Sequence, residues 1–170
     1  MRKFIQWFLV ITVISSIAWM VNKSVDKVNL RKAAEKKITT LPDLILHDVD
    51  SSALDISMFS NKYIVLIFFN SSCDHCQYEA IDVRNNVEAL SKSNIIFISS
   101  ETLLTIKAFA KSYGLDAYQN ISFAKIDDEN ATAIFGSISV PHVFIYGPDK
   151  ILRKEFKGET KVEAILKYLN

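Results

Sequence analysis

The run Tyr63–Phe69, which reads YIVLIFF, constrains the fold of this chain more than any other segment. An unbroken series of β-branched, aromatic and aliphatic residues is typical of a strand that is buried on both faces, because a strand with one solvated face alternates apolar and polar residues. A strand of that kind lies inside a sheet that is covered by helices on both sides. The run therefore predicts an α/β domain.

The remaining periodicity from Leu41 onward supplies the elements around this strand. Further strands are expected at 44–49, 94–99, 121–126, 142–146 and 151–156. A helical turn is expected at 52–59, and helices are expected over 74–90, 101–113, 127–135 and 159–169. Because strands and helices alternate before a closing β-hairpin, we predict a mixed sheet with helices on both faces, in which the parallel strands come first.

The front of the chain is apolar. The uncharged residues 4–21 would span about 27 Å as a helix, a length between that of a signal-peptide core and that of a full membrane span. Ser16 and Ala18 offer a cleavage site, but the apolar run continues past them through Trp19, which favours an uncleaved anchor. We therefore assign 1–21 to an N-terminal apolar helix, a membrane anchor or signal segment.

Charge separates this front end from the rest. Residues 1–37 hold eight Lys or Arg and two acidic residues, whereas 38–170 hold twelve Lys or Arg and seventeen Asp or Glu. We read 22–40 as a polar spacer and 41–170 as the folded domain. Six of the eight basic residues follow the apolar run, so a strict positive-inside count favours the domain on the cytoplasmic side. Because the first apolar segment of an exported chain usually enters with its short N-terminus inside, we nevertheless expect the domain on the extracytoplasmic side of the membrane. A mildly acidic domain has no basic face to neutralise phosphates, so nucleic acid is not an expected partner.

Both cysteines of the chain, Cys73 and Cys76, lie in the segment SSCDHCQYE directly after the buried strand. A helix is predicted to begin there, and its first N–H groups lack intrahelical partners and carry partial positive charge. Both effects stabilise a thiolate, so we expect a lowered pKa for Cys73. Because Cys76 lies one turn further along, the spacing also supplies a partner that can close a small disulfide ring.

The two residues between the cysteines are expected to have opposite effects on the Cys73 thiolate. His75 would add positive potential beside Cys73 and make the disulfide more oxidising, whereas the carboxylate of Asp74 disfavours a thiolate. A solvated helix residue is the alternative for His75.

Other uses of the two thiols stay open but are less favoured. A structural disulfide around two residues would constrain little, and a zinc site would need four ligands from a chain with only three histidines. Two inert buried thiols are the third alternative.

The motif CDHC, followed three residues later by Glu79, resembles the Cys-x-x-Cys-x-x-Glu signature of the TlpA-like and ResA-like membrane-anchored thioredoxins. The segment 139–145, SVPHVFI, resembles the thioredoxin-fold segment whose proline has a cis peptide bond and packs against the active-site disulfide. The resemblance covers about 41–169. It implies a thioredoxin fold and a thiol–disulfide oxidoreductase, and the sequence calls for no cofactor and no metal.

The resemblance also implies roles. Cys73 would attack, Cys76 would resolve, and Val140 with Pro141 would offer backbone groups to an incoming peptide. Glu79 is a candidate for proton transfer near Cys76, with an ordinary exposed helix residue as the alternative. The expected partners are protein disulfides or dithiols and a membrane or exported redox partner. The expected setting is a bacterial cell membrane, single-pass and contacted through the anchor segment, with the protein acting as a reductase.

Departures from the family pattern leave the client and the redox direction open. Ser72 stands where thioredoxins usually carry Trp, Ile67 stands where thioredoxin has a buried Asp, and no proline lies between the cysteines.

Three other functions are therefore kept. A Cu(I) metallochaperone could use Cys73, Cys76 and His142, because soft thiolates suit that ion. A thiol peroxidase would oxidise Cys73 to sulfenic acid, although Asn70 occupies the threonine position of the peroxiredoxin-like Pro-x-x-x-Thr-x-x-Cys pattern. A membrane-tethered interaction module would need neither thiol.

Overall fold

The chain divides into two compact units, Met1–Lys36 and Lys37–Asn170. The computed structural model describes residues 7, 15–17, 19–25, 37–50, 52–56, 59 and 61–169. Most of the predicted anchor at 4–21 lies outside these described residues. No helix within the described part of the chain has the length and apolar character needed to cross a membrane. The anchor and the spacer stay predictions.

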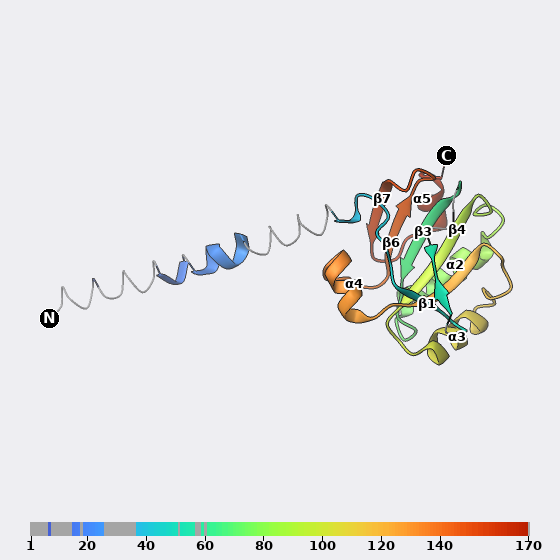
Figure 1. Cartoon of the computed structure of the whole chain (residues 1–170), viewed down its shortest axis with the longest axis horizontal. Helices are drawn as coiled ribbons and strands as arrows, with labels where there is room; N and C mark the ends of the chain where they lie inside the picture. Colours follow the sequence, from blue (N-terminus) through green and yellow to red (C-terminus); the bar gives the residue numbers. More distant parts are fainter. Residues whose placement is uncertain are drawn as a thin grey trace. The chain divides into compact units, whose positions relative to one another are not determined.

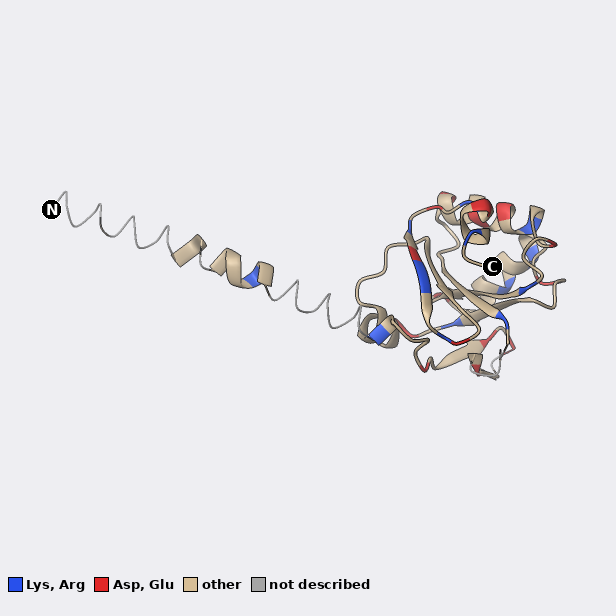
Figure 2. Ribbon diagram, turned by 90° about the horizontal axis from the view of Figure 1, so that it is seen from above, with Lys and Arg blue, Asp and Glu red and all other residues tan. Residues whose placement is uncertain are grey.

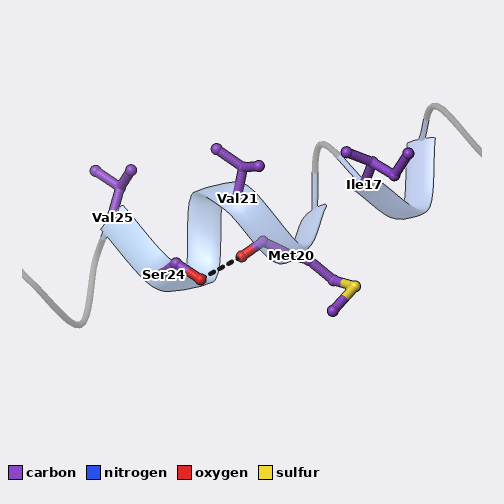
Figure 3. A pocket seen from close by; sticks show the side chains of 5 residues that line it. All are labelled: Ile17, Met20, Val21, Ser24 and Val25. Carbon is purple, nitrogen blue, oxygen red and sulfur yellow. Dashed lines mark hydrogen bonds between the residues drawn. The ribbon is translucent and has the colours of Figure 1, made fainter.

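The described part of the first unit is helical at 15–17 and 19–25. A hollow of about 470 Å³ runs along it, lined by Ile17, Met20, Val21, Ser24 and Val25 (Figure 3). The only polar side chain of that lining, Ser24, already donates its hydroxyl to the carbonyl of Met20 at 2.9 Å. The described lining of this hollow thus has no further polar side chain, and the candidate site lies in the second unit.

The described part of the second unit is built on a seven-stranded mixed sheet (Figure 1). Its strands are β1 (Leu46–Asp48), β2 (Ala53–Leu54), β3 (Tyr63–Phe68), β4 (Ser93–Ser99), β5 (Ile121–Lys125), β6 (His142–Tyr146) and β7 (Leu152–Lys157). Their order across the sheet is β2-β1-β5-β4-β3-β6-β7. Strands β3, β4 and β5 are parallel, whereas β6 and β7 on one side and β1 and β2 on the other are antiparallel.

Helices cover both faces of this sheet, as predicted. They are α2 (Asp74–Asn85), α3 (Leu103–Ser112), α4 (Asp128–Phe135) and α5 (Val162–Leu166). Helices α2, α3 and α5 pack on one face, and α4 packs on the other together with residues that precede β3 (Figure 1). Successive residues of β3 supply both faces, because strand side chains alternate: Ile67 packs beneath α2, and Phe68 packs beneath α4.

Aromatic rings fill both halves of the core. Beneath α2 and α3, Phe97 and Phe123 stack with their centroids 4.9 Å apart, and Phe69 meets the edge of Phe97 at 5.8 Å. On the opposite face, Phe68 contacts Phe135 at 4.9 Å. These contacts fix β3, and with it the start of α2, against the rest of the sheet.

Some predicted boundaries were wrong. The turn expected at 52–59 contains β2, because Asp48 donates its N–H to the carbonyl of Ser52 at 2.8 Å and closes a hairpin with β1. Helix α2 ends at Asn85 and not at Leu90, since Asn86 leaves helical geometry with φ −119° and ψ 21°. Similarly, α5 occupies only the middle of the predicted 159–169 helix.

Residues 37–40, which the sequence placed in the spacer, pack on the second unit. Ile38 is buried, and its carbonyl accepts a hydrogen bond from the Tyr146 hydroxyl at 3.1 Å. Thr40 forms an isolated bridge with Ile151.

Charged residues of both signs are interleaved over the second unit (Figure 2). Several of them form ion pairs, such as Lys107 with Asp50 at 3.0 Å and Arg153 with Asp149 at 2.6 Å. One further pair, His75 with Glu159, lies beside the cysteines.

Candidate active site

Cys73 is the residue that caps the start of α2. Its backbone is extended, with φ −87° and ψ 115°, and its Sγ accepts the N–H of Cys76 at 3.4 Å. A turn before the helix sets this geometry, because Cys73 donates its own N–H to the carbonyl of Asn70 at 3.1 Å. The sulfur therefore partners one of the N–H groups that the first turn leaves free. Cys73 lies where the sequence placed it, at the helix start.

The two thiols are both free but differ in exposure. Cys73 is half-buried, whereas Cys76 is only 1% exposed. Burial raises the pKa of Cys76 well above its ordinary value, and its interaction with Cys73 raises the pKa further. Cys73 is thus the thiol that another molecule can reach, and Cys76 is a protonated thiol behind it.

The segment before β6 faces Cys73. The Val140–Pro141 peptide bond is cis, as the family resemblance implied, and the carbonyl oxygen of Val140 lies 4.0 Å from the Cys73 Sγ. Strand pairing causes this approach, because β6 runs antiparallel to β3 and places His142 opposite Phe68, near the end of β3. Val140 is 38% exposed, so an arriving peptide can reach this backbone next to the sulfur.

A small pocket of about 130 Å³ adjoins the same segment. Its polar lining comes from Ser99, Ser100, Asp128 and Thr132, and Val140 forms part of its apolar wall. The pocket therefore reaches the segment that faces Cys73 through Val140, whereas neither cysteine lines it.

Glu79 is buried, with 1% of its surface exposed, so its interpretation as an ordinary exposed helix residue is wrong. Its Oε1 accepts the N–H of Thr160 at 3.2 Å, and its Oε2 has no partner among the described residues. Burial raises the pKa of Glu79 to about 8. The nearby charges of Glu159 and Asp82 also raise this pKa, whereas the hydrogen bond from Thr160 lowers it. Near neutral pH this carboxyl group is therefore protonated in most molecules and ionised in the rest.

Among the described residues, neither Asp74 nor His75 forms a hydrogen bond with the Cys73 sulfur. His75 is exposed, and its Nδ1–H donates to Glu159 Oε2 at 2.8 Å. Asp74 is exposed in the first turn of α2. Among the described residues, the hydrogen bonds of the Cys73 sulfur involve Cys76 and Val140.

A strap formed by Gly158–Val162 crosses α2 and was missed by the sequence reasoning. Besides the bond from Thr160 to Glu79 and the ion pair of Glu159 with His75, the N–H of Val162 donates to Asp82 Oδ2 at 2.7 Å. The α2 partners at 75, 79 and 82 follow helical spacing, so they share one face of the helix. No local pattern connects residues about eighty positions apart, so sequence periodicity could not have found the strap.

A second missed group, Glu101, holds the loop before Cys73. Ser71 donates its N–H to Glu101 Oε2 at 2.7 Å and its hydroxyl to Oε1 at 2.6 Å, and the Ser99 hydroxyl donates to Oε2 at 3.1 Å. Gln77 donates its side-chain amide to the carbonyl of Ser71 at 2.9 Å. A signal existed here: Glu101 follows β4, a parallel neighbour of β3, so the ends of both strands meet at one edge of the sheet.

His142 lies apart from the thiols. It stands opposite Phe68, its ring stacks on Phe144 at 4.4 Å, and its Nε2–H donates to Glu155 Oε1 at 2.8 Å. Burial lowers its pKa. Phe68 and Phe144 belong to the core face beneath α4, whereas Cys76 belongs to the other face.

The predicted Cu(I) ligands are therefore not brought together by the structure. Within the described residues, no group of three His, Cys, Asp or Glu side chains is arranged to hold a metal ion.

The fold and this site define a class. A mixed sheet with a Cys-x-x-Cys pair at the start of α2 and a cis-proline segment facing it is a thioredoxin fold with a dithiol site. The chain belongs to the AhpC/TSA family, whose sequence model matches residues 39–155.

Relatives support the same class. The thiol-disulfide oxidoreductase ResA of Bacillus thuringiensis subsp. konkukian is 24% identical over 133 residues, which cover 75% of this chain and 73% of ResA. A secreted Mycobacterium tuberculosis disulfide oxidoreductase homologous to E. coli DsbE has a TM-score of 0.61 at 16% identity, covering 79% of this chain and 96% of its own. The predicted resemblance to ResA-like proteins and the predicted thioredoxin fold are confirmed.

A peroxide-reducing protein shares the fold as well. The Xanthomonas campestris bacterioferritin comigratory protein has a TM-score of 0.58 at 15% identity, and the match covers 73% of this chain and 88% of that protein.

Proposed function

We propose that this protein is a thiol–disulfide oxidoreductase that reduces disulfides of extracytoplasmic protein substrates through Cys73 and Cys76. The observation that carries the proposal is the asymmetry of the two thiols: a reachable sulfur accepts a helix N–H, and a buried thiol follows one turn later. This arrangement supplies a nucleophile and a resolving group for one exchange cycle.

The cycle transfers two electrons. The Cys73 thiolate attacks one sulfur of a client disulfide, so that a mixed disulfide forms and the client's other sulfur leaves as a thiolate and takes a proton. Cys76 then loses its proton and attacks the Cys73 sulfur, which releases the second client thiol and closes the Cys73–Cys76 disulfide. A dithiol partner must return two electrons and two protons before the next cycle.

Glu79 would serve the second step. Its charge is among the causes that raise the pKa of Cys76, so the two groups interact. Cys76 must lose a proton in a buried position, and a carboxyl with a pKa of about 8 and one unpaired oxygen can exchange protons near neutral pH. Glu79 would take that proton when ionised and return it when the disulfide is reduced.

The backbone beside Val140 would hold the client. Its carbonyl faces Cys73, so an extended peptide that pairs with this segment would bring its own disulfide to the sulfur. The adjoining pocket would then accommodate the side chain next to the client cysteine.

Trapping of the mixed disulfide tests this function. The Cys76→Ser variant cannot complete the second step, so it should accumulate a covalent adduct at Cys73 with a disulfide-bonded peptide or with insulin, detected by mass spectrometry. The matched Cys73→Ser variant should form no adduct and should not reduce insulin. Absence of any adduct with Cys76→Ser would reject the proposed exchange.

Thiol peroxidase activity is a second candidate, favoured by the family match and by the similarity to a peroxide-reducing protein. Here the Cys73 thiolate would attack a peroxide, release an alcohol or water, and be left as sulfenic acid, which Cys76 would then condense into the disulfide with loss of water. Rapid consumption of peroxide that depends on Cys73 would establish this activity.

The proposed cellular setting is based on the front end of the sequence. We expect residues 4–21 to anchor the protein in a bacterial cell membrane with the second unit outside the cytoplasm, where disulfides persist. Protease treatment of spheroplasts should then digest the second unit, and a membrane fraction should retain the protein. Protection from the protease would contradict the predicted orientation.

A further inference from the structure

The ion pair between His75 and Glu159 bears on the direction in which the two cysteines exchange. His75 is a residue of the Cys-x-x-Cys motif, and an imidazolium beside the Cys73 sulfur would stabilise the thiolate. A stabilised thiolate favours the reduced form, which makes the disulfide more oxidising. In the structure the ring donates its Nδ1–H to Glu159 Oε2 at 2.8 Å, and the Cys73 sulfur accepts a hydrogen bond from the N–H of Cys76.

Glu159 is the fixed member of this pair. On one side Gly158 donates its N–H to the carbonyl of Pro141 at 2.9 Å, and on the other Thr160 donates its N–H to Glu79. The side chain of Glu159 is 26% exposed, against 70% for that of His75, which therefore is the member free to move.

The carboxylate of Glu159 is engaged at both oxygens. Its Oε2 accepts from His75, and its Oε1 lies 3.3 Å from Lys161 Nζ. The bond from His75, together with Lys161, holds the pKa of Glu159 below its ordinary value, so the carboxylate is charged near neutral pH. Two further acidic residues lie near His75: Asp74 precedes it in the chain, and Glu79 lies one turn further along α2 on the same face. Among the described residues, neither forms a hydrogen bond with the ring.

We propose that Glu159 keeps the Cys73–Cys76 pair reducing by holding the His75 ring away from the Cys73 sulfur. The inference rests on the proposed function and adds a positioning residue to it. An exposed ion pair changes the equilibrium constant between the paired and the separated arrangement by up to about fivefold. Release of His75 should therefore change the equilibrium constant of the dithiol by up to about fivefold, which corresponds to a potential about 20 mV less negative.

Equilibration with glutathione measures this effect. The dithiol and oxidised glutathione give the intramolecular disulfide and two molecules of reduced glutathione, so two electrons leave the protein. With the whole chain, Glu159→Gln should lower the equilibrium constant for oxidation by about two- to fivefold. The control Glu163→Gln removes an exposed charge from the first turn of α5 and should leave the constant unchanged.

A second background separates the action through His75 from a direct effect of charge. In a His75→Ala protein, Glu159→Gln should change the constant by less than twofold, because no ring is left to release. An equal shift with and without His75 would overturn the inference, and so would an unchanged constant in the single Glu159→Gln variant. A wild-type dithiol that never equilibrates with glutathione would instead reject the proposed function itself.

Discussion

Glu79 should make the stability of the reduced protein depend on pH, and Glu79→Gln should remove that dependence. Its pKa is about 8 in the folded protein, against an ordinary value of 4.5. Between these values the unfolded chain releases a proton that the folded protein keeps. Glu79 therefore contributes its full stabilisation to the free energy of unfolding below pH 4.5, the ordinary pKa. This stabilisation is lost as the pH rises toward 8, the pKa in the folded protein.

The size of this effect follows from the shift. Each pH unit inside the window lowers the free energy of unfolding by up to about 1.4 kcal/mol, and rounding near the two pKa values leaves a loss of about 2 to 3 kcal/mol between roughly pH 5 and 7.5. The amide that Glu79→Gln introduces would leave buried N–H groups without partners, but that cost does not vary with pH.

Urea unfolding of the reduced wild-type and Glu79→Gln proteins over this pH range measures the difference. The free energy of the wild type should fall relative to that of the variant by the stated amount. Glu88→Gln, at an exposed position after α2, should follow the wild type. A wild-type and a Glu79→Gln curve that run parallel to within about 0.5 kcal/mol would refute the assignment of a buried, protonated carboxyl.

Other substitutions test the surroundings of the site. Glu101→Ala leaves both donors of Ser71 unpaired and should lower the free energy of unfolding by about 2 to 3 kcal/mol in urea and slow insulin reduction, whereas Glu129→Ala should do neither. Phe97→Ala should cost about 3 to 5 kcal/mol in the same assay, and a loss below 1 kcal/mol would contradict the packing beneath α2. Burial lowers the pKa of His142, so its contribution to the free energy of unfolding is present above about pH 6.5 and is lost on acidification. His142→Phe should therefore make the free energy of unfolding less sensitive to acid. A variant that loses stability with acid as the wild type does would contradict this role.

Much of the fold could be predicted because its elements carry local patterns. The run at 63–69 specified a strand buried on both faces, and the glycines at 114 and 136 marked the ends of α3 and α4, where φ is positive. The short strand β2 escaped prediction, because its two residues form a strand only through pairing with β1. Such pairing is a tertiary effect that overrides local propensity.

Some residues of the site were predictable from the sequence, and others were not. Cys73 and Cys76 were predictable from their spacing after the buried strand, and the cis-proline segment was predictable from the family resemblance. The burial of Glu79 was not, because its position on α2 says nothing of the strap that covers it. The contact of His75 with Glu159 likewise depends on where the chain returns after β7.

The rate at which Cys73 is alkylated shows whether the start of α2 activates its sulfur. In the reduced protein near neutral pH, iodoacetamide should modify Cys73 several times faster than it modifies free cysteine, while the buried Cys76 stays unmodified, as read by mass spectrometry of timed samples. If Cys73 reacts no faster than an ordinary thiol, then the start of α2 does not activate its sulfur and the account of an exchanging nucleophile is wrong.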